Sequence, residues 1–210
     1  EMCGNGIRCF SKYVFDKQIV DDTKFVIETA VGLKEIELKP LNKKTALVKV
    51  NMGDWFLCTD KIPVSSKQEK YIMQTLYVGQ KDIKISCVRV GVPHAVIFLD
   101  DLNKKITNSW GPYIEMMEVF PSGINVNFVK VINKRTITID TWERGVGRTL
   151  ACGTGACASA IISNYLGLTD NKVNVKVPGG EITIDVAQSG QVTMQGKAEC
   201  ICDGIFLYDN

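Results

Sequence analysis

The chain has 210 residues, 23% of them charged, and a formal net charge of only +2 at pH 7. A chain without a strong basic field is not expected to bind nucleic acid or a membrane surface, and no apolar run is long enough for a membrane span. Eight cysteines could form the disulfide framework of a secreted protein. They lie instead in glycine motifs and strand patterns of a long, strand-rich chain, which favours a reducing cytoplasm.

The first predicted helix begins in a cysteine–glycine motif. Residues 3–6 read Cys-Gly-Asn-Gly, and the apolar residues after them recur at helical spacing. Strand patterns follow at 25–32 and 35–38, with a glycine turn between them, and residues 46–52 alternate between apolar and polar. Helix, hairpin and strand are therefore expected in that order.

The middle of the chain is predicted to be mainly strands. A polar stretch at 60–70 is a plausible crossover, and a helical or irregular segment is expected at 108–120. The predicted strands are 71–78, 83–90, 95–99, 125–132 and 136–142.

A second copy of the opening pattern follows. Residues 152–155 read Cys-Gly-Thr-Gly before another helical pattern, and then come the hairpin 173–185 and the strand 192–196. A repeat at this long period indicates a duplicated domain rather than a solenoid. Two such domains facing each other across a pseudo-twofold axis would bring Cys3 and Cys152 to one cleft.

Both cysteines are expected at helix starts, where unpaired amides lower the pKa of a thiol and bind carboxylates. One thiolate could remove a proton from a carbon next to a carboxylate while a neutral thiol delivers one to the opposite face. A redox pair is the rival use, although such pairs usually read Cys-x-x-Cys. The remaining cysteines are expected to be small packing residues: Cys9, Cys58, Cys87, Cys157, Cys200 and Cys202.

Other candidate residues have two interpretations at this point. His94, the only histidine, is either structural or a site residue delivered at the mouth of a strand. Glu143 and Arg144 could form a surface ion pair or bind a zwitterion, and Asn125 and Asn127 could face solvent or a substrate. A zinc site lacks the required spacing, and neither glycine loop fits a phosphate-binding or dinucleotide motif.

Several motifs together resemble the diaminopimelate epimerase family over essentially the whole chain. They are residues 2–9 (MCGNGIRC), 91–96 (GVPHAV), 125–128 (NVNF), 142–147 (WERGVG), 151–157 (ACGTGAC) and 178–180 (PGG). The resemblance implies interconversion of LL- and meso-diaminopimelate without pyridoxal phosphate, metal or other cofactor, in lysine and peptidoglycan synthesis. It also implies a cytoplasmic homodimer.

The implied fold is α+β, with two pseudo-symmetric domains that each wrap a curved mixed sheet around a central helix. Residues 1–47 with 198–210 would form the N-terminal domain, and 48–197 the C-terminal domain. A last strand near 201–208 would return to the first domain. The family's N-terminal strands are expected to be missing here, so that residues 1–210 alone would fold poorly or be inactive.

The resemblance also assigns roles to individual residues. Cys3 and Cys152 would be the acid–base pair, with His94 and Glu143 supporting the proton transfers. The reacting carboxylate would be held by backbone amides, those of Gly4, Asn5, Gly153 and Thr154. Asn125 and Arg144, with Glu143, would contact the rest of the substrate, its distal amino-acid group above all.

Two positions depart from the family pattern. Val92 stands where the family often has asparagine and cannot make that side-chain contact, and Arg148 replaces a common glutamate. A two-cysteine racemase that acts on a different amino acid, such as proline or histidine, is the nearest rival enzyme, although Arg144 and Asn125 favour a substrate with a distal charge. The same residues could also belong to a thiol redox protein or to a paralogue that only binds a ligand.

Overall fold

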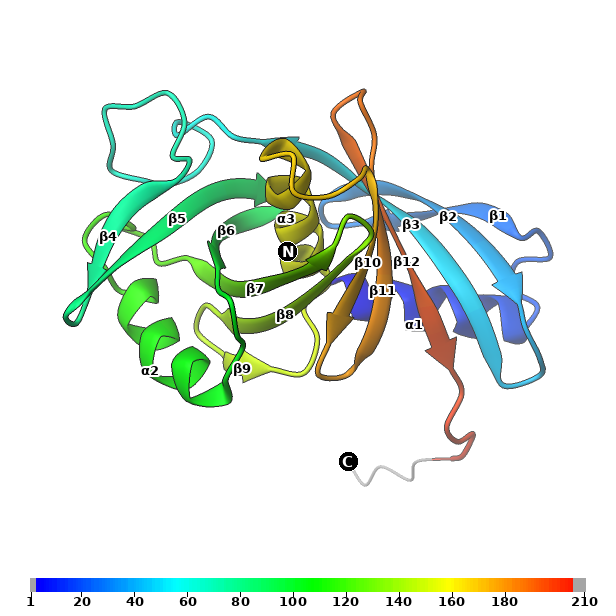
Figure 1. Cartoon of the computed structure of the whole chain (residues 1–210). Coiled ribbons are helices and arrows are strands. Elements are labelled where there is room, and N and C mark those ends of the chain that lie inside the picture. Colours follow the sequence, from blue (N-terminus) through cyan, green and yellow to red (C-terminus); the bar gives the residue numbers. More distant parts are fainter. Residues whose placement is uncertain (1–2, 206–210) are drawn as a thin grey trace, which may run out of the picture.

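The computed structural model describes residues 3–205, which form three helices and twelve strands (Figure 1). None of these helices is long and apolar enough to cross a membrane. The elements are α1 (Gly4–Asp16), β1 (Lys24–Thr29), β2 (Gly32–Pro40), β3 (Thr45–Phe56), β4 (Gln74–Val78), β5 (Lys81–Val90), β6 (Val92–Phe98), α2 (Lys104–Glu115), β7 (Asn125–Asn133), β8 (Thr136–Glu143), β9 (Gly147–Thr149), α3 (Gly153–Tyr165), β10 (Lys172–Val177), β11 (Gly180–Val186) and β12 (Gln191–Glu199).

All of these strands belong to one mixed sheet. Their order is β1-β2-β3-β12-β11-β10-β8-β7-β6-β5-β4, with β9 beside β8. The end of β3 also pairs with β5, through Trp55 opposite Val90 and Phe56 opposite Arg89. The strands from β3 around to β5 therefore close into a barrel-like ring.

A bend in β3 makes this closure possible. Gly53 has a φ of +92°, a left-handed conformation that glycine adopts without strain. The register between β3 and β12 shifts at the same place, between Val192 and Thr193. Because a bulge bends a strand, the last residues of β3 turn away from β12 and meet β5.

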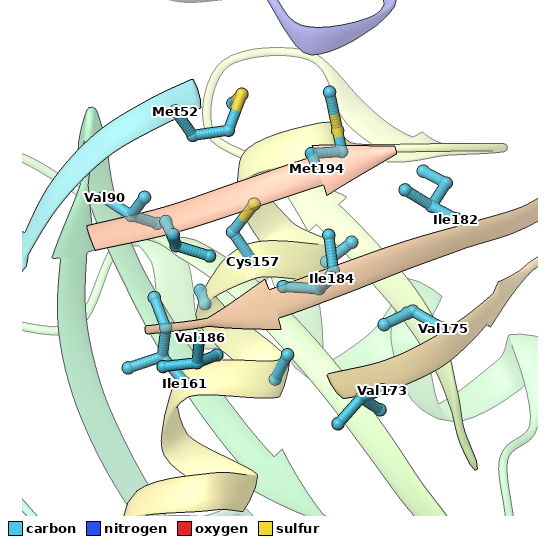
Figure 2. Close-up of a cluster of buried hydrophobic side chains, with 14 of the residues drawn as sticks. Met52, Val90, Cys157, Ile161, Val173, Val175, Ile182, Ile184, Val186 and Met194 are labelled. Carbon is cyan, nitrogen blue, oxygen red and sulfur yellow. The ribbon is translucent and has the colours of Figure 1, made fainter. Parts of the chain in front are cut away.

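Helix α3 fills the ring. It packs against β5 to β8 and against β10 to β12, and every residue from Gly153 to Ser163 is buried. A helix whose side chains are small or apolar on all sides is expected to be enclosed by other elements. Figure 2 shows Cys157 and Ile161 of α3 beside apolar side chains of β10, β11 and β12.

The predicted repeat of helix, hairpin and strand is present in the structure. It consists of α1-β1-β2-β3 and α3-β10-β11-β12, and β3 pairs antiparallel with β12 at the centre. The two copies therefore form one continuous sheet, where the resemblance implied two. The larger core cluster also joins them, since Val48 of β3 belongs to it together with Ile161 of α3.

The remaining helices cover the sheet from outside the ring. Helix α1 packs against β2, β3 and β12, and α2 packs against β4, β7, β8 and β9. The apolar side chains around α2 form a second core cluster, which includes Phe128 and Ile114. Residues 201–205 do not form the expected last strand, since β12 ends at Glu199. Residues 206–208 of that predicted strand lie outside the described residues.

Candidate active site

The two cysteine–glycine motifs adopt the same local structure. Cys3 is the N-cap of α1 (φ −114°, ψ 103°) and Cys152 is the N-cap of α3 (φ −118°, ψ 112°). Each sulfur accepts a hydrogen bond from an amide in the first turn, Gly6 N at 3.3 Å and Gly155 N at 3.4 Å. Each thiol thus takes the place of the serine or aspartate oxygen of an ordinary N-cap.

The two helix starts touch each other. A Cβ atom built on Gly4 would lie 3.3 Å from the Cα of Gly153, and one built on Gly153 would lie 3.1 Å from the Cα of Gly4. The side-chain amide of Asn5 donates to Ala151 O at 3.2 Å and joins the same two loops. Two positive helix ends that converge in this way favour negative charge between them.

A methyl group added at this contact should lower the stability of the protein. Gly153→Ala would place its Cβ 3.1 Å from both Gly4 Cα and the Met194 sulfur, and overpacking of this kind costs about 1–3 kcal/mol. We expect a lower free energy of unfolding in urea and, because the helix starts separate, weaker substrate binding. Gly204→Ala is the control, since its Cβ meets nothing within 4 Å. Equal stability of the two variants would contradict the contact.

The two thiols lie in different surroundings. Cys3 is exposed, whereas Cys152 is buried. Burial raises the pKa of the Cys152 thiol to about 12, with a further upward contribution from the Glu143 carboxylate. Hydrogen bonds from Thr154 and Gly155 act in the opposite direction but are smaller than the burial effect. Cys152 therefore holds its proton at neutral pH.

The other cysteines match the packing expectation only in part. Cys87 and Cys157 are buried and Cys58 is half-buried, but Cys9, Cys200 and Cys202 are exposed. For Cys9 the reason is that α1 packs on the sheet by one face only, whereas α3 is enclosed. All eight cysteines lie within the described residues and are free.

His94 is fully buried on β6, which begins at Val92 rather than at residue 95 as predicted. Its Nδ1 atom is 3.1 Å from the side-chain nitrogen of Asn127. Burial, followed by the positive charge of Arg144, lowers the pKa of His94 to about 3. The imidazole is therefore neutral at physiological pH and can act as a hydrogen-bond donor rather than as a cation.

Asn125 connects the strand of His94 to the loop of Glu143 and Arg144. Its side-chain nitrogen donates to Pro93 O at 2.8 Å, and its oxygen accepts from the backbone N–H of Arg144 at 2.9 Å. The Arg144 guanidinium donates to Ser122 O at 2.9 Å. Asn125 thus links the Glu143–Arg144 segment to β6, through one buried and one partly buried hydrogen bond.

Glu115, at the end of α2, holds the same segment from the other side, and sequence reasoning missed it. Its carboxylate accepts from Trp142 Nε1 at 2.7 Å and from Gly145 N at 2.9 Å. Nothing in the residues around Glu115 signals this role, because its partners are about thirty positions away. Only the packing of α2 on β8 and β9 brings them together.

Arg148, on β9 shortly before Cys152, has a structural role. Its Nε donates to Asp140 Oδ2 at 2.9 Å, and Thr107 donates to the same oxygen at 2.8 Å. Both members of the ion pair are mostly buried, with side-chain exposures of 17% and 7%. The arginine therefore attaches β9 to β8 and to α2.

Val92 and Arg144 line one cavity of about 630 Å³. Its wall also carries three further charged side chains, those of Lys34, Asp54 and Arg89. Neither Cys3 nor Cys152 lines this cavity. Val92 thus contributes an apolar surface to a cavity of mixed charge.

The family model and the related sequences agree on one family. The model of the family described as diaminopimelate epimerase matches residues 1–57 and 86–201. The chain belongs to the diaminopimelate epimerase family. It is 45% identical over 207 residues to the diaminopimelate epimerase of Clostridium perfringens, covering 99% of this chain and 74% of that one. The corresponding enzyme of Methanothermobacter thermautotrophicus is 44% identical over 212 residues, covering 100% and 74%.

Solved structures of more distant proteins share the fold. A probable proline racemase from Agrobacterium radiobacter K84 superposes with a TM-score of 0.65 at 18% identity, covering 96% of this chain and 68% of that one. A hydroxyproline epimerase from Agrobacterium vitis gives a TM-score of 0.66 at 14% identity, covering 95% and 66%. The fold is therefore the mixed α+β fold of this group, and the diaminopimelate epimerase family is one of isomerases.

Proposed function

We propose that this member of the diaminopimelate epimerase family interconverts LL- and meso-diaminopimelate by a two-thiol mechanism, in lysine and peptidoglycan synthesis. The observation that carries the mechanism is the contact between Gly4 and Gly153, which places two cysteine-capped helix starts together. The family match and the identity of 42–45% to several diaminopimelate epimerases support the choice of substrate.

The reaction needs one base and one acid on opposite faces of the α-carbon. In the first direction, the Cys3 thiolate takes the α-proton, and the electron pair left on carbon delocalises into the carboxylate. The neutral thiol of Cys152 then gives its proton to the other face, which leaves the configuration inverted. In the reverse direction the two thiols exchange roles. Proton transfer between sulfur and carbon completes both steps, so the mechanism requires neither pyridoxal phosphate nor a metal.

The reacting carboxylate would bind between the two helix starts. Backbone amides of Gly4, Asn5, Gly153 and Thr154 would hold it, because the unpaired N–H groups and dipoles of α1 and α3 both favour negative charge. The same amides would stabilise the additional charge that develops as the proton leaves. Binding of the carboxylate also removes the mutual repulsion of the two positive helix ends.

The polar residues beside the thiols would support proton transfer and bind the rest of the substrate. Neutral His94 would donate a hydrogen bond, and Glu143, which interacts with the Cys152 thiol, would raise the proton affinity of that sulfur. Arg144 would bind the distal carboxylate, for which a guanidinium offers two parallel donors. Asn125 would hold Arg144 in place and contact the same end of the substrate.

The domain division, assembly and location are also part of the proposal. Residues 1–47 with 198–210 and residues 48–197 would be two pseudo-symmetric halves, each built around one of the helices α1 and α3. The mirrored strand order β1-β2-β3 and β12-β11-β10 supports two pseudo-symmetric halves, with the proposed boundary inside β3. We further propose a homodimer in the reducing cytoplasm, where the thiols remain free to transfer protons.

Isotope exchange tests the function directly. The reduced protein is incubated with LL-diaminopimelate in deuterium oxide, and deuterium uptake at the α-carbon is followed together with the isomer ratio. We expect uptake together with meso product. Deuterium uptake by proline or histidine instead would support a racemase of a different amino acid. Val92→Asn would then be the first substitution to test. In a preparation whose cooperative unfolding shows that the protein is folded, a lack of exchange with every substrate under reducing conditions would exclude the two-thiol mechanism.

A further inference from the structure

Asn127 is a fully buried polar residue on β7 that has no part in the proton transfers described above. Its side chain lies between three groups of the site region. The amide nitrogen is 3.0 Å from Ala95 O and 3.1 Å from His94 Nδ1, and the amide oxygen accepts from the Thr141 hydroxyl at 3.0 Å. Thr141 and His94 are buried as well.

These partners fix which way the amide points. The Ala95 carbonyl can only accept a hydrogen bond, so the NH₂ group of Asn127 must face it. The oxygen then faces Thr141, whose hydroxyl is able to donate. The second hydrogen of the NH₂ group points to His94 Nδ1, which must therefore carry a lone pair rather than a proton.

This hydrogen bond sets the tautomer of His94. A neutral imidazole carries one proton, and with Nδ1 accepting from Asn127 that proton is on Nε2. His94 Nε2 is buried and has no hydrogen-bond partner among residues 3–205. A buried N–H without a partner is costly, which is expected where the group serves a ligand or a reacting atom.

Asn127 also touches the helix start that holds Cys152. A Cβ built on Gly155 would lie only 2.4 Å from Asn127 Oδ1. The N–H of the same glycine is the donor to the Cys152 sulfur. A single side chain therefore contacts both His94 and the first turn of α3, and it fixes one relative to the other.

We propose that Asn127 is a positioning residue for the epimerisation. It holds His94 as the Nε2–H tautomer, so that the imidazole donates a hydrogen bond to the thiolate or carboxylate that becomes negative during the reaction. The inference rests on the proposed function for its catalytic part, whereas the tautomer can be observed without any substrate. Asn127 itself touches no reacting atom in this scheme.

The single histidine makes the tautomer directly measurable. The full chain is labelled with ¹⁵N-histidine, and the couplings between the ring nitrogens and carbon-bound protons identify the protonated nitrogen at pH 8. The unchanged protein should show the Nε2–H form. The amide of Asn127 donates to both Ala95 O and His94 Nδ1, whereas the carboxyl of Asn127→Asp carries at most one hydrogen and cannot donate to both. Nδ1 should therefore gain a proton. We expect kcat to fall at least about tenfold with little change in KM, as for other residues that orient a site imidazole.

Ser163→Ala is the matched control, because it removes a buried hydroxyl at the far end of α3 that bonds to Ser159 O. It should leave both the tautomer and kcat unchanged. If the aspartate variant fails to fold, Asn127→Ala is the second variant, and its loss of the Nδ1 hydrogen bond should shift the Nδ1 resonance.

Three results would overturn the proposal. The first is an Nδ1–H form of His94 in the unchanged protein. The second is a His94 ring-nitrogen spectrum that is the same in both Asn127 variants as in the unchanged protein. The third is a changed ring-nitrogen spectrum with an unchanged kcat. A failure of the proposed function would look different, since no isotope exchange would occur in any variant while the histidine spectra would still report the tautomer.

Discussion

Cys152→Ala should lower the rate of epimerisation by a factor of about 10²–10⁴ or more, the range that general acid–base groups contribute. Without this thiol nothing delivers a proton to one face of the α-carbon. The measurement is formation of meso product from LL-diaminopimelate together with deuterium uptake. Cys3→Ala should have an effect of similar size, because each cysteine serves as base in one direction and as acid in the other.

The two alanine variants should also differ in a diagnostic way. Each keeps one thiol and should exchange deuterium only into the isomer whose α-proton faces that thiol, without inversion. Cys157→Ala is the control, because this cysteine is buried in the same helix but caps nothing. If Cys157→Ala lost as much activity as Cys152→Ala, the effect would be one of packing, and the acid–base assignment would fail.

Acid should destabilise the protein through His94. Its pKa is about 3 in the folded chain and about 6.5 when unfolded. Between these values the unfolded chain binds the proton and the folded chain does not, so the free energy of unfolding falls as the pH falls. From pH 7 to pH 4 this one group should remove about 3 kcal/mol. Urea unfolding at several pH values measures the loss.

His94→Gln isolates this contribution, because glutamine carries no charge at any pH while carboxylates elsewhere are unchanged. The variant should lose clearly less stability between pH 7 and pH 4 than the original protein. Parallel stability curves for the two proteins would show that His94 does not remain neutral when folded.

Much of the local structure was predictable from the sequence. The Cys-Gly-x-Gly motifs, each followed by apolar residues at helical spacing, predicted helices at both places, and α1 and α3 begin there. The hairpins that follow were visible from alternating apolar residues and glycine turns. Such features depend on residues only a few positions apart, which is why a single chain read in order reveals them.

The number of sheets could not be predicted in this way. The alternation of apolar and polar residues in β3 and β12 predicts that each strand is half-buried, but it does not predict that the two strands pair with each other. The antiparallel pairing of β3 with β12 connects the halves into one sheet, and Gly4 fits closely against Gly153 and Met194. These are contacts between residues more than a hundred positions apart.

The sequence by itself therefore determined the chemistry: two thiols at two helix starts, a single histidine and a Glu143–Arg144 pair, in an arrangement that resembles one family. The tertiary structure decided how these groups differ. Burial makes Cys152 a thiol and His94 a neutral ring, and Asn127 and Glu115 acquire their partners only through packing. The physical reason is that pKa values and tautomers depend on desolvation and on neighbours in space, and those exist only once the ring has closed around α3.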